Sequence, residues 1–280
     1  MKVKFLGTAA AEGIPAMFCR CETCQRARRS GGKDLRMRAS VLIGDELLAD
    51  LGPDINAQRM AFGLDLSRLE TVVFTHSHSD HLDGFELTRR CTSNYCHIPQ
   101  EKPLRVYGNQ RVLELARQSL EIEFGAPEDP SLDLRLLRAG QSVQAGKITV
   151  TALAARHDPA EECLCYLFAD EASAFLLAND TDLPGEDFYG QLKGALAGRT
   201  LTAASLDCTF GPGGPGGRHM DLPRMKQVRA RLLADGCADE HTRFIATHFT
   251  HNCGCLHSEL EAVLMPEGFE PAWDGMTLEL

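Results

Sequence analysis

The sequence lacks the features that mark membrane, exported and nucleic-acid-capturing proteins. No apolar run approaches the ~18 residues that a membrane-spanning helix requires. The apolar segment within Met1–Gly7 is too short for a signal peptide, so we expect a cytoplasmic protein. Asp and Glu outnumber Lys and Arg by 39 to 29, and the formal charge of −10 argues against capture of nucleic acid by a generally basic surface.

Cysteine, in contrast, is abundant. The 280 residues include 11 cysteines, and in a chain without an export signal these are more often metal ligands or reduced core residues than disulfides. Cys19, Cys21 and Cys24 follow a Cys-x-Cys-x-x-Cys pattern, which can supply three thiolates to one tetrahedral zinc ion and needs a fourth ligand from elsewhere. The alternative interpretation is a set of reduced loop thiols.

A histidine-rich segment follows a short apolar run. The run Leu69–Phe74 predicts a buried strand, and an extended backbone after it would direct alternate side chains to the same side. Imidazoles and carboxylates are ligands for zinc, manganese and iron, and four such groups exceed what one catalytic ion with an open position needs. We therefore expect two ions here. The four residues are His76, His78, Asp80 and His81.

Further ligand-type side chains stand where other predicted strands end. A lone histidine or carboxylate is more often structural than ligating, so residue type alone does not assign these positions. They are His157, Asp180, Asp207 and His248. His219 differs, because it follows Gly211–Gly217, whose glycines and prolines exclude regular structure, and precedes a predicted helix.

The order of the predicted elements indicates an α/β protein. Predicted strands fall into two successive blocks with helices between them, which predicts two packed mixed sheets flanked by helices. Ser40–Asp50 is typical of a hairpin with Gly44 at its turn, Asn109 is placed to cap an amphipathic helix, and Asp80 and His81 are expected to open another. Because no linker or repeat stands out, we expect one domain over residues 1–280, with the cysteine loop at about 18–25.

The pattern His-x-His-x-Asp-His after an apolar strand resembles the signature of the metallo-β-lactamase-fold hydrolases. His76–His81 carries this pattern in full, and four ligand-type residues at this spacing disfavour a polar loop of surface histidines. Members of this fold with di-iron redox chemistry are similar but carry Glu in place of His78, so the resemblance implies hydrolysis. It also implies a metallo-β-lactamase-like αββα sandwich.

The cysteine triplet, together with a histidine three residues after the last ligand, resembles the PhnP-type cyclic phosphodiesterases. This resemblance implies two divalent ions in the active site, manganese or zinc or iron, and one structural zinc. One active-site ion would be held by His76, His78 and His157, the other by Asp80, His81 and His248, with Asp180 bridging. The structural zinc would be held by Cys19, Cys21, Cys24 and His251, and Cys253 and Cys255 remain alternatives to His251.

The same resemblance implies roles beyond metal binding. His219 would contact the scissile phosphate and protonate the leaving group, and Asp80 would belong to the catalytic centre as well as to the ligand set. Asp207, at the end of a predicted strand, is a candidate to orient a ligand imidazole without itself contacting the metal ion. The alternative for His219 is a neighbour of a helix start without a catalytic role.

These features together predict a metal-dependent phosphodiesterase for small, cyclic phosphodiesters, with a water between the two ions as nucleophile. A tRNA-processing nuclease or thioesterase of the same fold is one alternative, and a non-catalytic zinc- or redox-responsive protein is another. We expect a small phosphodiester as partner, neither nucleic acid nor a membrane, and leave a homodimer open. The charge of −10 does not oppose an anionic substrate, because divalent ions govern the local field.

Overall fold

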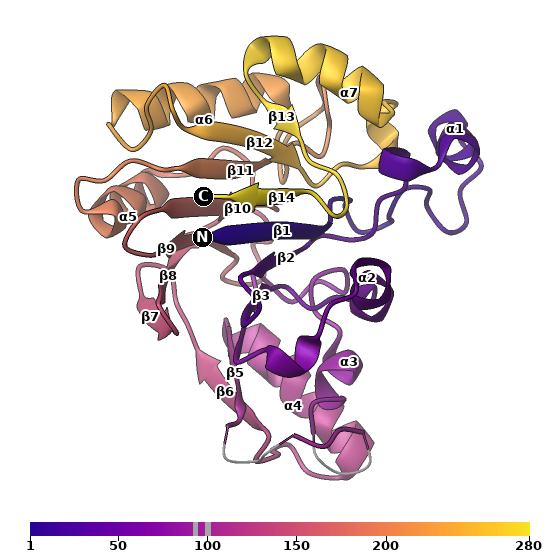
Figure 1. The fold of residues 1–280 in the computed structure, drawn as a ribbon, viewed down its shortest axis with the longest axis vertical. Helices are drawn as coiled ribbons and strands as arrows, with labels where there is room; N and C mark the ends of the chain where they lie inside the picture. Colours follow the sequence, from indigo (N-terminus) through magenta and orange to yellow (C-terminus); the bar gives the residue numbers. More distant parts are fainter. Residues whose placement is uncertain (92–94, 99–101) are drawn as a thin grey trace.

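Two seven-stranded sheets form the centre of the computed structural model, which describes residues 1–91, 95–98 and 102–280 (Figure 1). The first sheet has the order β14 (Thr277–Glu279), β1 (Lys2–Gly7), β2 (Ser40–Ile43), β3 (Leu47–Ala49), β4 (Thr71–Val73), β5 (Leu104–Gly108) and β6 (Leu132–Leu136). The second has the order β13 (Glu270–Pro271), β12 (Arg243–Thr247), β11 (Ala203–Asp207), β10 (Ala174–Ala178), β9 (Leu164–Ala169), β8 (Ile148–Ala154) and β7 (Ser142–Ala145). Both are mixed: β3 to β6 and β10 to β13 run parallel, and the remaining neighbours are antiparallel.

Helices cover the outer face of each sheet. The first sheet packs against α2 (Ile55–Phe62), α3 (Gly84–Thr88) and α4 (Gln110–Phe124). The second packs against α5 (Glu186–Leu196), α6 (Leu222–Ala234) and α7 (His257–Leu264). The remaining helix, α1 (Glu22–Ser30), projects at the right of the view in Figure 1. This arrangement confirms the predicted αββα sandwich of two mixed sheets.

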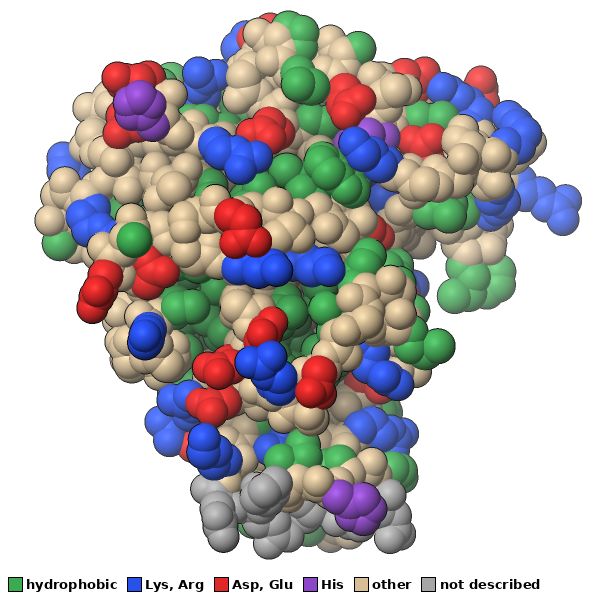
Figure 2. Space-filling model, in the orientation of Figure 1, with side chains coloured by type: hydrophobic (Ala, Val, Ile, Leu, Met, Phe, Trp, Pro, Cys, Tyr) green, Lys and Arg blue, Asp and Glu red, His purple; other side chains and the backbone are tan. Residues whose placement is uncertain are grey.

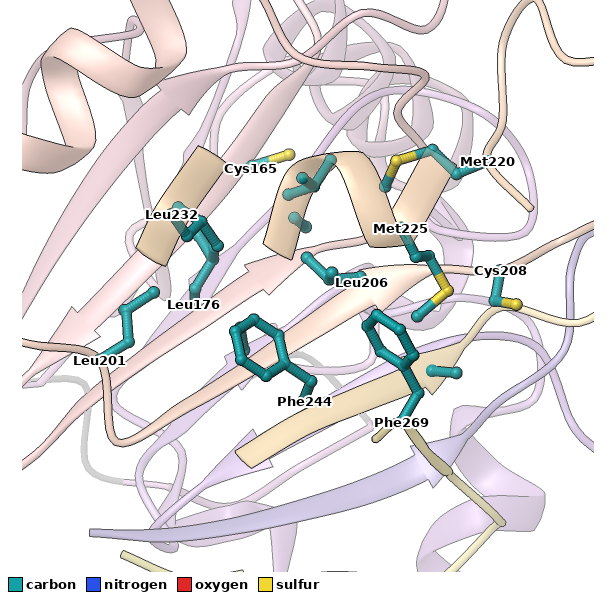
Figure 3. Packing of buried hydrophobic residues seen from close by; sticks show 14 of the residues in the cluster. Cys165, Leu176, Leu201, Leu206, Cys208, Met220, Met225, Leu232, Phe244 and Phe269 are labelled. Carbon is teal, nitrogen blue, oxygen red and sulfur yellow. The ribbon is translucent and has the colours of Figure 1, made fainter. Parts of the chain in front are cut away.

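Aromatic and branched side chains fill the space between the sheets. Phe5 of β1 meets the edge of Phe175 of β10, with ring centroids 6.3 Å apart, and both side chains are fully buried. A second cluster lies between the second sheet and its helices, where Leu176 lies beside Leu232 of α6 and Leu206 lies beside Met225 of the same helix (Figure 3). Complete burial of one such side chain contributes roughly 1.5–3 kcal/mol. The packed strands therefore fix the positions of the loops that follow them.

Local sequence signals account for most element boundaries. Asn109 caps α4 as predicted, since its side-chain oxygen accepts from the Val112 backbone N–H at 2.9 Å. Gly44 adopts φ 62° at the turn of the β2–β3 hairpin, also as predicted. The expected helix start at Asp80 and His81 is wrong, because α3 begins at Gly84 with the Asp83 carboxylate as its cap.

Strand direction brings several loops to one edge of the sandwich. β10, β11 and β12 run parallel, and β8 runs in the same direction because β9 is antiparallel to both β8 and β10. Their C-terminal ends therefore lie at the same edge, where ligands bind in open α/β sheets. Tyr166 of β9 ties the first sheet to this edge by donating to the Phe74 carbonyl at 2.6 Å, just after β4.

The surface seen in Figure 2 has no extended basic area. Lys and Arg side chains lie beside Asp and Glu over most of this face, and they gather only over the projecting α1 region. No helix in the described ranges is both long and apolar enough to cross a bilayer.

Candidate metal centre

The loops after β4, β8, β10 and β12 bring all seven predicted dinuclear ligands together. Several overlapping groups form, each with its candidate ligand atoms within 4.8 Å of one another, and two of them match the predicted ligand sets. The first group is His76, His78 and His157, and the second is Asp80, His81 and His248. Asp180 lies between them: its Oδ2 is 2.9 Å from Nε2 of both His81 and His248, and its Oδ1 is 3.8 Å from Nε2 of His157.

Four of the converging atoms are buried and have no hydrogen-bond partner in the described structure. They are the Nε2 atoms of His76, His81 and His248, and Oδ2 of Asp180. The close approaches of Asp180 do not have hydrogen-bond alignment, and a buried polar atom left unpaired costs about 1–3 kcal/mol. With Nδ1 hydrogen-bonded elsewhere, neutral rings of His81 and His248 would direct Nε2 lone pairs at the Asp180 carboxylate, and a cation between these atoms would satisfy both. The donor set of imidazole and carboxylate suits zinc, manganese or iron.

Backbone strain is concentrated at the same place. Asp50, Asp180 and His248 have φ values of 64°, 49° and 64°, and outside glycine only one other described residue, Ala197, is left-handed. Side chains rarely adopt this region, and such residues persist where the surrounding structure fixes them. This backbone conformation occurs just after each strand ends, and it turns the side chains of Asp180 and His248 toward the other candidate ligands.

Each candidate histidine has its second ring nitrogen tied to a partner outside the group. Such partners fix the orientation and tautomer of a ligand imidazole. The pairs are His76 Nδ1 with Thr75 Oγ1 at 3.0 Å, His78 Nε2 with Asp158 at 3.0 Å, His81 Nδ1 with Asp50 at 2.7 Å, His157 Nδ1 with the Arg218 carbonyl at 3.1 Å, and His248 Nδ1 with Thr209 Oγ1 at 3.0 Å.

Asp50 is a functional candidate that sequence reasoning missed. Its carboxylate is buried, and besides His81 it accepts from the backbone N–H of Thr75 at 2.8 Å. It follows β3 as Asp180 follows β10. Its position after an apolar strand is therefore the sequence feature that could have identified it. Nearby Gly52 is required by close packing, because a Cβ there would lie 2.1 Å from the Asp80 carbonyl oxygen.

Asp207 contacts His219 directly and the candidate ligand His248 through Thr209. Its Oδ2 lies 2.8 Å from Nδ1 of His219 but 4.0 Å from Nδ1 of His248, whose Nδ1 is instead bonded to Thr209 Oγ1. Asp207 is itself fixed, since Thr209 Oγ1 and the Met220 backbone N–H donate to its Oδ1 at 2.8 and 3.1 Å. The second carboxylate oxygen is thus left for the imidazole.

Charge and burial oppose each other in the centre. Burial would lower the pKa of His219, but the hydrogen bond and charge of Asp207 outweigh it and raise the pKa to about 9. Burial lowers the pKa of His76 well below its usual value, whereas at His81 the charges of Asp180, Asp80 and Asp50 outweigh burial and raise the pKa well above it. Burial would raise the pKa of Asp180, but the neighbouring His248 and His81 lower it overall.

His219 also depends on the loop that precedes it. Gly211–Gly217 is irregular, as predicted, but polar contacts hold it at two points. The Gly214 N–H donates to Asp221 at 3.0 Å, and the Gly217 N–H donates to Asp182 at 3.0 Å. Asp221 also caps α6, so the loop and the helix after His219 share one anchor.

The cysteine triplet forms a second candidate site with His251. The three sulfurs and a ring nitrogen of His251 lie within 4.8 Å of one another, with His251 Nδ1 3.3 Å from Cys21 Sγ and 3.6 Å from Cys19 Sγ. Cys21 caps α1 and Cys24 lies in its first turn, so the triplet spans a helix start rather than a simple loop. Three sulfurs and one imidazole are a tetrahedral zinc ligand set.

The two alternative cysteines point elsewhere. A Cβ built on Gly211 would lie 3.5 Å from Cys253 Sγ, which places that side chain against the glycine-rich loop, and Cys255 donates to the Cys253 carbonyl at 3.5 Å. The thiols of the triplet differ in acidity: the His251 hydrogen bond lowers the pKa of Cys21 to about 6, whereas burial raises that of Cys24 to about 11.

A pocket of about 290 Å³ opens onto the dinuclear group. Its floor includes His78, His157 and Asp180, and its walls add His219 and Phe210 from the segment after β11. The other lining residues are Asp80, His248, Thr209, Ala10, Ala11, Glu12, Arg218, Thr250 and Asn252. The volume suits a small molecule more than a folded polymer.

Comparison with known proteins agrees with this geometry. Residues 46–249 match the family model described as a beta-lactamase superfamily domain, and the chain belongs to this superfamily. It thus has the fold of metallo-β-lactamase-type hydrolases, which implies divalent-metal binding and confirms the resemblance read from the central motif.

Individual relatives differ in what they are named for. A curated octanoyltransferase of Porphyromonas gingivalis is 31% identical over 164 residues, which are 56% of this chain and 31% of that protein. A diphosphatase of the PhnP family has a similar structure, with a TM-score of 0.75, 22% identity and coverage of 100% and 97% of the two chains. Zinc-bound PqqB from Methylobacterium extorquens follows with a TM-score of 0.71, 18% identity and full coverage of both. The chain thus spans about a third of the curated relative's length, and at these identities the structures show the fold alone.

Asp50→Asn tests whether the outer carboxylate supports the centre. The amide removes the charge that orients His81, and loss of such a partner typically lowers metal affinity by about 10–100-fold. Competition with a chelator, read as metal content per chain, measures the change. Asp45→Asn, at an exposed position with 56% of its side chain accessible, is the matched control and should retain the wild-type affinity. Equal affinity in both variants would contradict the assignment.

Proposed function

We propose that this protein is a metal-dependent phosphodiesterase that hydrolyses small, cyclic phosphodiesters. The observation that carries the proposal is the convergence of four unpaired buried ligand atoms beside a histidine that can donate a proton. Phosphoryl transfer requires cations at the phosphoryl oxygens and an acid at the departing oxygen, and the pocket offers a place for both.

The chain offers two ligand groups for the active-site ions. His76, His78 and His157 would hold one divalent ion and Asp80, His81 and His248 the other, with Asp180 as a further ligand between the two groups. Bound manganese, zinc or iron would supply Lewis acidity at the phosphoryl oxygens and lower the pKa of water. Cys19, Cys21, Cys24 and His251 would hold a zinc ion with a structural role.

His219 has the role of proton donor to the leaving group in this proposal. Its Nδ1 is bonded to Asp207, which fixes the tautomer and leaves Nε2 as the nitrogen that transfers the proton. The hydrogen bond and charge of Asp207 raise the pKa of His219 to about 9, which favours the protonated form that a general acid requires. Such an acid typically contributes a factor of about 10²–10⁴ in rate.

Two alternatives are less well supported. A tRNA-processing nuclease would need a basic surface for the polymer, and the chain has a formal charge of −10 and a pocket of about 290 Å³. A non-catalytic zinc- or redox-responsive protein would account for the cysteine site but not for the separate cluster of histidines and carboxylates. A thioesterase remains an outcome of the substrate test below.

A substrate panel tests the function directly. The protein loaded with manganese or zinc should hydrolyse bis(p-nitrophenyl) phosphate and a ribose cyclic phosphate, and should leave an acyl thioester intact. Asp180→Ala should abolish turnover and lower the metal content, because it removes the carboxylate between the two groups. Asp45→Ala, exposed and distant, should retain both. Turnover of the thioester alone, or full activity of Asp180→Ala, would refute the proposal.

The role of His219 is tested by varying the leaving group. His219→Ala should slow hydrolysis of an alkyl phosphodiester by about 100-fold or more, because an alkoxide needs a proton as it departs. Hydrolysis of a p-nitrophenyl diester should slow much less, since nitrophenolate departs unprotonated. Metal content should stay at the wild-type level, and the exposed His241→Ala serves as control. An equal loss on both substrates, or loss of metal, would show that His219 has another role.

A further inference from the structure

One carboxylate in the wall of the candidate pocket has no part in the ligand groups described above. Glu12 lies in the turn after β1, whose neighbours Ala10 and Ala11 also line the pocket. Its side chain is 30% exposed, so it is neither buried in the core nor free on the surface.

The backbone that carries Glu12 is fixed to the end of β12. Ala10 donates its N–H to the Phe249 carbonyl at 2.9 Å, and Phe249 donates to the Thr8 carbonyl at 2.9 Å. Gly13 closes the turn by donating to the Ala10 carbonyl at 3.0 Å. Because Phe249 directly follows the candidate ligand His248, Glu12 has a fixed position relative to the dinuclear group.

The carboxylate is held through one oxygen only. Thr250 Oγ1 donates to Oε1 of Glu12, and His251 Nε2 lies 3.5 Å from the same oxygen. The other nitrogen of His251 faces the cysteine sulfurs, so Nε2 is the ring nitrogen directed at Glu12. Within the described ranges, no partner is found for Oε2. This oxygen is left able to accept hydrogen bonds from a bound molecule.

The pocket walls therefore combine three kinds of hydrogen-bonding group. Glu12 only accepts, the guanidinium of Arg218 only donates, and Asn252 does both. A hydroxyl group both donates and accepts, so a group bearing several hydroxyls suits all three walls. An ammonium group would be repelled by the like charge of Arg218, and a second phosphate or a carboxylate would be repelled by the like charge of Glu12.

We propose that Glu12 is a specificity-determining residue that selects substrates whose organic part is neutral and polyhydroxylated, and that rejects substrates carrying a second anionic group. The inference rests on the proposed phosphodiesterase function. The scissile phosphate belongs at the ligand groups, so Glu12 contacts the part of the molecule that does not react. Juxtaposed like charges and unpaired polar groups both discriminate against the wrong ligand.

Three p-nitrophenyl phosphodiesters with the same leaving group test this role. Their other ester group is methyl, 2,3-dihydroxypropyl, or 2,3-dihydroxypropyl with one hydroxyl phosphorylated. Wild-type kcat/KM should be highest for the dihydroxypropyl ester. In Glu12→Ala the preference for dihydroxypropyl over methyl should fall about tenfold, because a hydrogen bond to a charged group is lost. Relative kcat/KM for the doubly anionic ester should rise about tenfold in Glu12→Ala and in Glu12→Gln.

Two controls separate specificity from stability. Glu240→Ala changes a glutamate with 83% of its side chain exposed, in the loop before β12 and thus at the opposite end of that strand from the pocket, and should leave the preferences unchanged. Metal content and thermal midpoint of the Glu12 variants report whether the site is intact. A uniform loss on all three esters, or unchanged preferences in an intact variant, would overturn the role of Glu12. Failure of the wild type on all three would instead contradict the phosphodiesterase proposal.

Discussion

The account depends on one physical constraint: buried lone pairs that point at one another need positive charge between them. Nε2 of His76, His81 and His248 and Oδ2 of Asp180 are withdrawn from water without hydrogen bonds in the described structure. Leaving such atoms unpaired is costly, and the cost is concentrated within a few ångströms. The left-handed backbone at Asp180 and His248 adds to it. A protein keeps such an arrangement where a bound cation repays it, as expected for a member of the beta-lactamase superfamily.

The rest of the fold serves to hold that arrangement. Two sheets bury aromatic side chains against each other, and the strands that carry the candidate ligands end at one edge. The run from His248 to His251 after β12 connects the two candidate centres, since its first residue belongs to the dinuclear group and its last to the cysteine group. Glu12 contacts this run at Thr250 and at His251. A metal at the cysteine site would therefore stiffen the wall of the pocket as well as the start of α1.

The sequence predicted the parts that depend on local pattern. The motif from His76 to His81 is contiguous, and the family resemblance selected His157, Asp180 and His248 among the residues at strand ends, so the residues that converge could be named. The orientation of the ligand side chains could not be predicted, because it depends on contacts between segments that are distant in the sequence. Asp50 lies 31 positions from His81, and Asp158 lies 80 positions from His78. For the same reason the direct contact of Asp207 with His219 could not be predicted. The start of α3 was misplaced because Asp80 and His81 occupy turns held by Gly52 and by tertiary contacts rather than by helix propensity.

The most direct test is a crystal structure of the protein grown with manganese or zinc, with anomalous scattering used to locate the ions. The account predicts two peaks in the pocket, one next to His76, His78 and His157 and the other next to Asp80, His81 and His248, with the Asp180 carboxylate between them. A single surface peak, or a pocket without anomalous signal and with the imidazoles turned apart, would contradict it.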